Sequence, residues 1–192
     1  MRQIRQGVFE TNSSSVHAIC IATNPNSYRV KATPISLSFE KFGWEWDLHR
    51  DAQTKANYAV TALFQSYRHD KEHVVEKVKE FQSWLEEEKV YRNDWNNYKM
   101  LTNAIFGESL YCAINYPEDG EYWHLPDNVS GIDHGYETKE FVDYVFASKE
   151  RMWNFLFSDD SFIQTGNDND EDYEGIDLDD IKYDHEIFIK GN

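Results

Sequence analysis

The chain is poor in cysteine, in basic residues and in long apolar runs. Its only cysteines, Cys20 and Cys112, lie in short apolar stretches where cysteine behaves as a small buried side chain. No Cys-x-x-Cys spacing occurs, so the sequence suggests neither a zinc knuckle nor a thioredoxin-type site. No apolar run approaches the roughly 18 residues of a membrane-spanning helix, and the N-terminus lacks the apolar core of a signal peptide. We therefore expect a cytoplasmic protein without a membrane segment.

The scarcity of basic residues sets the charge of the molecule. There are 35 acidic residues and 19 basic ones, which gives a formal net charge of −16. Such a field repels nucleic acid and anionic membranes, and it attracts basic protein surfaces. We expect no direct binding to nucleic acid or membrane, and we expect a host protein with a basic surface as the partner. A purely solubilising role for the charge is the alternative.

Aromatic residues are abundant instead, with 12 Phe, 12 Tyr and 6 Trp in 192 residues. Side chains of this size are expected to dominate the core. The length suits a single domain over residues 1–192, because no internal repeat and no Pro- or Ser-rich linker divides the chain. Strands and helices are clustered along the sequence instead of alternating strictly. The predicted fold class is α+β, with an antiparallel sheet, a helical pair and further short helices.

Strands are expected where β-prone residues alternate or cluster between turn signals. A first strand over 2–9 is expected to form a hairpin with a second over 16–22, across a polar turn. Pro34 interrupts the alternation over 28–39, which therefore reads as an edge or broken strand. The remaining expected strands cover 42–48, 109–116, 161–165 and 186–190.

Helices are expected where apolar residues recur at a spacing of three and four. Two long ones cover 51–68 and 71–89, with Asp51 and Asp70 as N-caps. The short joint between them predicts an antiparallel pair or one kinked rod. A helix over 95–106 is expected next, and Thr138 and Ser148 are the expected caps of two short helices over 138–147 and 149–157.

The N-terminal string RQGVFETNSSSVH is the first candidate site. In a hairpin, its basic, hydroxyl and imidazole groups could converge on a phosphate or carboxylate. Arg5 would then clamp the anion, the serine run would donate hydrogen bonds, and His17 would act as acid, base or ligand. The alternative is a plain turn, with His17 facing solvent or bonded to a main-chain carbonyl. The candidate catalytic residues, completed by His134 from a later loop, are Arg5, Ser13, Ser14, Ser15, His17 and His134.

The same string, from Arg5 to His17, resembles the recurring N-termini of many phage and bacterial proteins. Those begin with a basic residue, continue through a Gly-Val-Phe-type step and end in an asparagine, a serine run and often a histidine. The likeness covers about thirteen residues of the chain. It implies association with a phage and a place in the cytoplasm, and it carries no activity.

A second candidate lies in Gly131–Gly135, where Asp133 and His134 stand between glycines in a long aromatic loop. An Asp-His pair of this kind could ligate a metal or act as a polarised base. A simple loop turn is the alternative, because neighbouring side chains in an extended loop usually point apart. These two residues could also meet His17, Asp168 and Asp170 in one site, although no spacing requires it.

The third candidate is the acidic stretch over residues 159–186, which holds twelve acidic residues and one lysine, Lys182. Asp170, Asp172 and Glu174 copy the opening of a calcium loop, but Ile181 stands where a bidentate glutamate is needed. A metal, if bound, would be divalent and held by Asp133, His134, Asp170 and Asp172. The stretch is expected to be partly irregular and to dock on a basic groove. The expected partner-binding residues are Asp168, Asp170, Asp172, Glu174, Asp177, Asp179 and Asp180.

Two main hypotheses for function follow from these features. The first is a phage or mobile-element accessory protein that binds and occludes a basic surface of a host protein, such as a defence or nucleic-acid-processing protein. The alternative is a small nucleotide- or metal-dependent enzyme that uses the N-terminal arginine, serines and histidine. A structural or assembly component is a third possibility, which strong self-association without a ligand would indicate.

Overall fold

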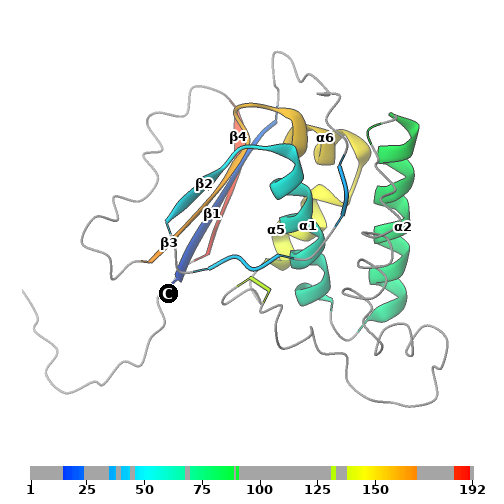
Figure 1. Ribbon diagram of the computed structural model, residues 1–192, viewed down its shortest axis with the longest axis horizontal. Helices are drawn as coiled ribbons and strands as arrows, with labels where there is room; N and C mark the ends of the chain where they lie inside the picture. The colour runs from blue at the N-terminus through cyan, green and yellow to red at the C-terminus, as the bar shows by residue number, and fades with distance from the viewer. Residues whose placement is uncertain are drawn as a thin grey trace, which may run out of the picture.

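The computed structural model describes residues 15–23, 35–37, 40–43, 46–67, 70–88, 90, 131–132, 138–167 and 184–190 (Figure 1). The strands are β1 (Ser15–Ala22), β2 (Asp47–His49), β3 (Phe162–Asn167) and β4 (His185–Lys190). The helices are α1 (Ala52–Ser66), α2 (Lys71–Glu87), α5 (Lys139–Val145) and α6 (Lys149–Phe157). Among these described helices, none is both long and apolar enough to cross a membrane. The α+β prediction is confirmed.

The four strands form one antiparallel sheet in the order β2-β3-β1-β4. The strand β1 is therefore interior, and it pairs with β3 from Ser15 to Cys20 and with β4 from His17 to Ala22. Both of its edges are occupied, which leaves no edge for the expected hairpin with residues 2–9. The hairpin prediction is wrong because short-range turn signals say nothing about partners from the far end of the chain. Residues 2–9 themselves lie outside the described part.

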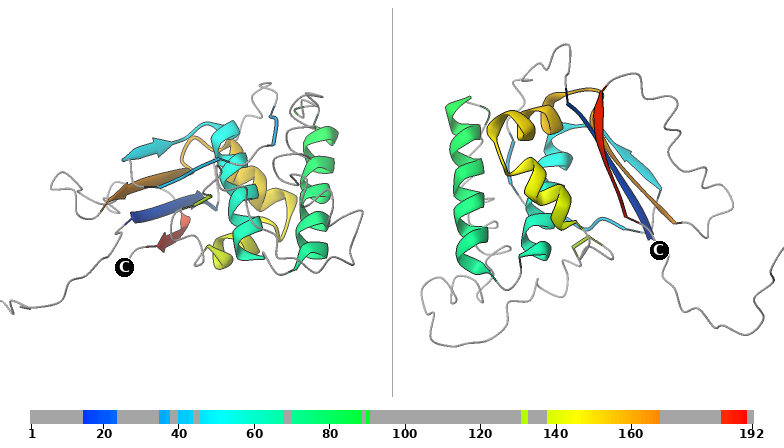
Figure 2. Two further views of the ribbon diagram at one scale, coloured as in Figure 1. Left: turned by 60° about the horizontal axis from the view of Figure 1, so that its bottom comes forward. Right: turned by 180° about the vertical axis from the view of Figure 1, so that it is seen from behind.

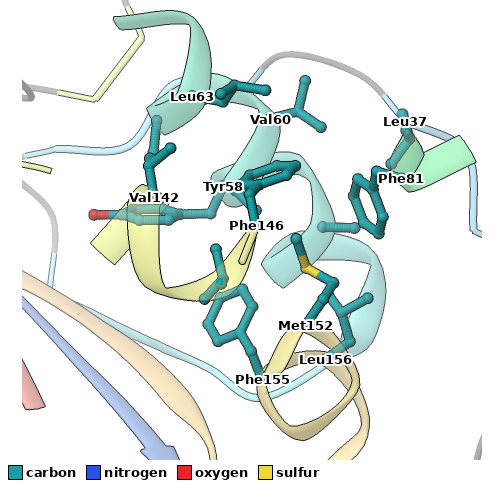
Figure 3. Packing of buried hydrophobic residues seen from close by; sticks show 14 of the residues in the cluster. Leu37, Tyr58, Val60, Leu63, Phe81, Val142, Phe146, Met152, Phe155 and Leu156 are labelled. Atoms are coloured by element: carbon teal, nitrogen blue, oxygen red, sulfur yellow. The ribbon is translucent and has the colours of Figure 1, made fainter. Parts of the chain in front are cut away.

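The helices lie on one side of the sheet, with α1, α5 and α6 against it and α2 farther out (Figures 1 and 2). Alternation along β1 directs Ile19 and Ile21 toward these helices, where they join the main hydrophobic cluster. Tyr58 from α1, Phe141 from α5 and Phe155 from α6 meet edge-to-face, with ring centroids 5.1–5.7 Å apart. Figure 3 shows part of this cluster. The aromatic core expected from composition is present.

The predicted long helices and their caps are confirmed. The Asp51 carboxylate accepts a hydrogen bond from the Thr54 N–H, and the Asp70 carboxylate accepts one from the His73 N–H. The helices α1 and α2 run antiparallel (Figure 1), as the short joint between them allows. The apolar stripe expected on α2 is buried throughout, and its members are Val74, Val78, Phe81 and Leu85.

The two short helices differ in how they begin. Ser148 caps α6 as expected, because its hydroxyl accepts a hydrogen bond from the Arg151 N–H at 3.3 Å. Thr138 occupies the N-cap position of α5 but makes no side-chain cap. Its hydroxyl instead lies 3.0 Å from the Ser66 hydroxyl on α1, so it ties two helices together.

The helix α1 is buried on all sides from Lys55 to Phe64, where the sequence pattern indicated a single buried face. Two glutamines on it hold extended segments by paired hydrogen bonds to main chain. The Gln53 amide bonds to both the N–H and the carbonyl of Ser36, and the Gln65 amide does the same with Ile132. A central helix can therefore carry polar residues inward, provided that each one has a partner.

The remaining expected strands are only partly tested. Of the range 28–39 the structure describes 35–37, which lie outside the sheet, and the Ile35 N–H donates to the Val90 carbonyl. The expected strand over 42–48 is shorter, because β2 begins at Asp47 and Phe42 pairs singly with Ile132. Strands over 161–165 and 186–190 are confirmed as β3 and β4. The helix over 95–106 and the strand over 109–116 lie outside the described residues.

Candidate functional site

Acidic residues from the two ends of the acidic stretch lie at the same end of the sheet. Because β1 is antiparallel to both neighbours, its last residues lie beside the first residues of β3 and β4. In this register Cys20 pairs with Phe162, and Ala22 pairs with His185. The carboxylates that precede β3 and those that begin β4 therefore share this end. We call the set the acidic end, and it consists of Asp159, Asp160, Asp184 and Glu186.

Main-chain hydrogen bonds fix the position of the acidic end. The Thr23 N–H, just after β1, donates to the Asp184 carbonyl at 2.9 Å. On the other side of β1, the Arg50 guanidinium donates to the Asp159 carbonyl at 2.7 Å. Asp159, Asp184 and Glu186 are exposed, and Asp160 is partly exposed. The carboxylates are thus presented to solvent from an ordered frame.

Two arginines lie near the acidic end, and both lie over aromatic rings. Arg50 is 4.8 Å from the centroid of the Phe162 ring, and Arg151 is 4.4 Å from that of Tyr144. In the part of the chain that the structure describes, no ion pair involves Asp160, Asp184 or Glu186. The arrangement leaves negative charge available to a cation from outside.

The charges at the acidic end act on the pKa values of two neighbours, the buried Cys20 and the partly buried Tyr144. Burial raises the pKa of the Cys20 thiol to about 11, with Arg50 lowering it and Asp160 raising it. Burial also raises the pKa of Tyr144, against Arg151 and together with Glu186. Cys20 is therefore a protonated, inert thiol at neutral pH, because the thiolate is the reactive form.

The predicted partner-binding residues lie between the described ends of the acidic stretch. Asn167 pairs with Ser15 at one end of the sheet, and His185 pairs with Ala22 at the other. The segment that connects Asn167 to Asp184 therefore starts and finishes at opposite ends of the sheet. The predicted residues themselves lie outside the described part of the chain, namely Asp168, Asp170, Asp172, Glu174, Asp177, Asp179 and Asp180.

His17 lies inside the fold, on the helix-facing side of β1. Its side chain is 1% exposed, and its ring lies 6.2 Å from that of Tyr58 on α1. It pairs in register with Thr165 of β3 and Lys190 of β4. Of the alternatives for His17, the one in which it faces solvent is wrong, because alternation along β1 places it in the same layer as Ile19. Its burial gives no support to a role on an external anion.

The other residues of the predicted catalytic set are not brought to His17 within the described part. Ser15 begins β1 opposite Asn167. Gly131 has a φ of 64°, a left-handed conformation that suits glycine, and Ile132 after it is buried and held by Gln65. Arg5, Ser13, Ser14, Asp133 and His134 lie outside the described residues. Across the described ranges, no three His, Cys, Asp or Glu side chains lie close enough to hold a metal.

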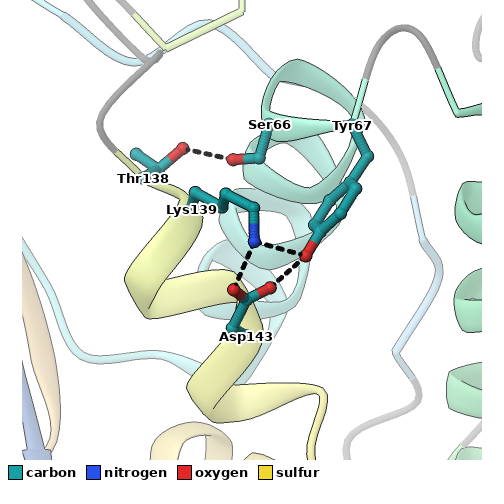
Figure 4. A network of polar contacts seen from close by, with 5 residues as sticks. All are labelled: Ser66, Tyr67, Thr138, Lys139 and Asp143. Carbon is teal, nitrogen blue, oxygen red and sulfur yellow. Dashed lines mark hydrogen bonds and ion pairs between the residues drawn. The ribbon is translucent and has the colours of Figure 1, made fainter.

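A polar network that the sequence did not predict joins α1 to α5 (Figure 4). The Tyr67 hydroxyl donates to the Asp143 carboxylate, and the Lys139 ammonium donates to both of them. The His73 ring of α2 lies against Tyr67, with centroids 4.2 Å apart. Only the Lys139–Asp143 pair, four residues apart on α5, could have been read from the sequence. The network fastens the end of α1 and the start of α2 to α5.

The network makes the free energy of unfolding depend on pH in the acidic range. Burial alone would raise the pKa of Asp143, but hydrogen bonds from Lys139 and Tyr67 outweigh it and hold that pKa below 3.8. A carboxyl with a depressed folded-state pKa stabilises the fold above its unfolded value and loses this effect as the pH falls through the folded value. The side chain is half-exposed, so solvent screening limits the contribution to about 0.5 kcal/mol.

We therefore expect Asp143→Asn to lower the free energy of unfolding by about 0.5 kcal/mol near neutral pH. The difference from the unmodified protein should shrink as the pH falls below 3.8, where the unmodified protein loses its charge too. Urea unfolding at several pH values measures it. Glu76→Gln, at an exposed position on α2, is the control and should change little. A difference that stays constant with pH would contradict the electrostatic account.

Comparison with known proteins found no relative of this chain. No family model matches the chain, and neither a curated protein nor a solved structure is significantly similar to it.

Proposed function

We propose that the protein is a phage-type accessory protein that binds a basic surface of a host protein and occludes it. The observation that carries the proposal is the acidic end, where the carboxylates that precede β3 and those that begin β4 are held at one end of the sheet. The excess of acidic residues, which gives −16, extends the same sign over the molecule. A phage origin rests on the N-terminal resemblance alone.

The charges of the acidic end suit a cationic partner for a physical reason. Asp160, Asp184 and Glu186 make no ion pair with a described residue, so a partner would not have to break an existing pair. Complementary charge steers encounter and fixes orientation more than it adds affinity. The partner's arginines and lysines would then be the groups that otherwise hold nucleic acid or another anion.

Occlusion in this mechanism requires only binding, without a catalytic step by the protein. The acidic surface would approach a basic groove under long-range attraction, and the partner's cations would pair with carboxylates at contact. Apolar side chains in the acidic stretch, Tyr173, Ile176 and Leu178 among them, would fill pockets between those cations. The groove would then be closed to its usual anionic ligand. Nucleic acid is not a direct ligand, since this field repels it.

A capture experiment from a bacterial lysate tests the proposal. The tagged full-length chain should retain one near-stoichiometric protein at low salt and lose it at high salt, because screening weakens exposed charge pairs. The combined variant Asp160→Asn, Asp184→Asn and Glu186→Gln should retain less of it. The matched control carries Glu72→Gln, Glu76→Gln and Glu86→Gln on α2, which removes the same charge elsewhere.

The outcomes distinguish an effect of the acidic end from an effect of the net charge of the molecule. Loss of capture in the acidic-end variant and retention in the α2 variant supports the proposed surface. Equal loss in both would mean that only net charge matters. Capture that is indifferent to salt and to both variants, or no capture at all, would overturn the proposal.

A further inference from the structure

The strand β2 is a sheet edge that carries exposed apolar side chains. It stands first in the strand order and pairs with β3, and among the described residues no strand pairs with its other side. Trp46 just before it is 63% exposed and Leu48 within it is 37% exposed. These two are the exposed large hydrophobic side chains of the described chain. Residues two apart along a strand share a face, so both belong to one patch.

A carboxylate accepts a main-chain hydrogen bond at this edge. The Leu48 N–H donates to the Asp47 carboxylate at 2.8 Å, and that carboxylate also lies 3.6 Å from Nδ1 of His49. The Asp47 side chain is 60% exposed. A charge at a sheet edge is a common protection against pairing with another edge of the same kind. Here the protecting group carries a negative charge, so a positively charged segment can still approach.

Charge excludes a second copy of this chain as the occupant. Two β2 edges in contact would bring two Asp47 carboxylates together, on molecules that each carry a net charge of −16. A segment with lysine or arginine would instead pair with Asp47 and release the Leu48 N–H for a main-chain bond. Its apolar side chains would cover Trp46 and Leu48, which are now in water.

We propose that β2 accepts an extended basic segment of a partner protein as a fifth strand. Such strand addition gains affinity from main-chain hydrogen bonds and selectivity from alternate side chains. The segment would alternate basic and apolar residues, with the basic ones near Asp47. The inference goes beyond the proposed occlusion by the acidic end, because its contacts are a sheet edge and two apolar side chains.

A synthetic peptide tests the edge without knowledge of the partner. The probe is a capped peptide of about six residues, the usual strand length, that alternates lysine and valine. Its control has the same sequence with alternate main-chain nitrogens methylated, which keeps charge and side chains and removes main-chain donors. Binding to the full-length chain is measured by calorimetry at moderate salt. The unmethylated peptide should bind at least about tenfold more tightly than the methylated one.

Variants locate the binding. Trp46→Ala should weaken binding of the unmethylated peptide about tenfold, since an exposed tryptophan that becomes buried is a frequent anchor. Asp47→Asn should weaken it and reduce its salt dependence, whereas Glu76→Gln on α2 should not. Equal affinity for the two peptides, or binding that Trp46→Ala leaves unchanged, would overturn the proposal. So would a concentration-dependent dimer of the free protein that Trp46→Ala abolishes. A failed lysate capture with intact peptide binding would remove the proposed function alone.

Discussion

Replacing Lys55 with methionine lowers the free energy of unfolding by about 3 kcal/mol or more in our expectation. Lys55 is fully buried on α1, and its ammonium donates to the Ser158 carbonyl at 3.1 Å and to the Ser161 carbonyl at 2.9 Å. These carbonyls lie where α6 ends and β3 is about to begin. Methionine fills a similar volume but donates nothing. The two buried carbonyls then lose a donor, at a cost of about 1–3 kcal/mol each.

The effect should be large because the junction around Lys55 connects three elements. The Ser161 hydroxyl donates to the Asn154 carbonyl of α6 and accepts from the Ala22 N–H at the end of β1. A helix end buried without donors for its last carbonyls is unfavourable, and Lys55 supplies one such donor. Loss of the ammonium therefore disturbs α6, β3 and β1 together.

Urea unfolding followed by circular dichroism measures the change for Lys55→Met. The matched control is Lys79→Met at an exposed position on α2, which should stay within about 0.5 kcal/mol of the unmodified protein. A Lys55→Met variant as stable as the Lys79→Met variant would mean that the junction does not depend on the ammonium.

Local signals in the sequence were enough for the helices α1, α2 and α6 and their caps. Asp51, Asp70 and Ser148 cap α1, α2 and α6 as their side-chain chemistry predicts. The same reasoning gave no prediction for the polar residues Lys55 and Gln53 of α1. Their partners lie far away in sequence, at Ser158 and Ser36, and a single sequence gives no sign of such pairs.

Strand order is the part of the fold that the sequence could not supply. The segments of β1, β3 and β4 were recognisable from β-prone residues, but their pairing joins residues nearly the whole chain apart. The same pairing decides where His17 points and why Asp160 and Asp184 lie at the same end of the sheet. The acidic stretch was visible as a run of charge, yet the placement of Asp159, Asp160, Asp184 and Glu186 at one end of the sheet follows from the antiparallel register.

Neutralising the acidic end should slow association with the captured partner about tenfold at low salt, through the variant Asp160→Asn, Asp184→Asn and Glu186→Gln. Electrostatic steering raises on-rates by about 10- to 1,000-fold, and its loss appears in the association rate before the dissociation rate. Neutralising Asp170, Asp172 and Glu174 in the acidic stretch should slow it further and flatten its dependence on salt. Stopped-flow mixing at two salt concentrations measures both rates.

The control for this kinetic experiment is again the α2 variant with Glu72→Gln, Glu76→Gln and Glu86→Gln. It carries the same net charge as the acidic-end variant, so a uniform field would slow both equally. A slower association confined to the acidic-end variant places the encounter at that end of the sheet. If the association rate stays unchanged and only dissociation accelerates, the carboxylates act in the bound complex and not in steering. If neither the association rate nor the dissociation rate changes, the charge has only a solubilising role, which is the alternative that composition alone allowed.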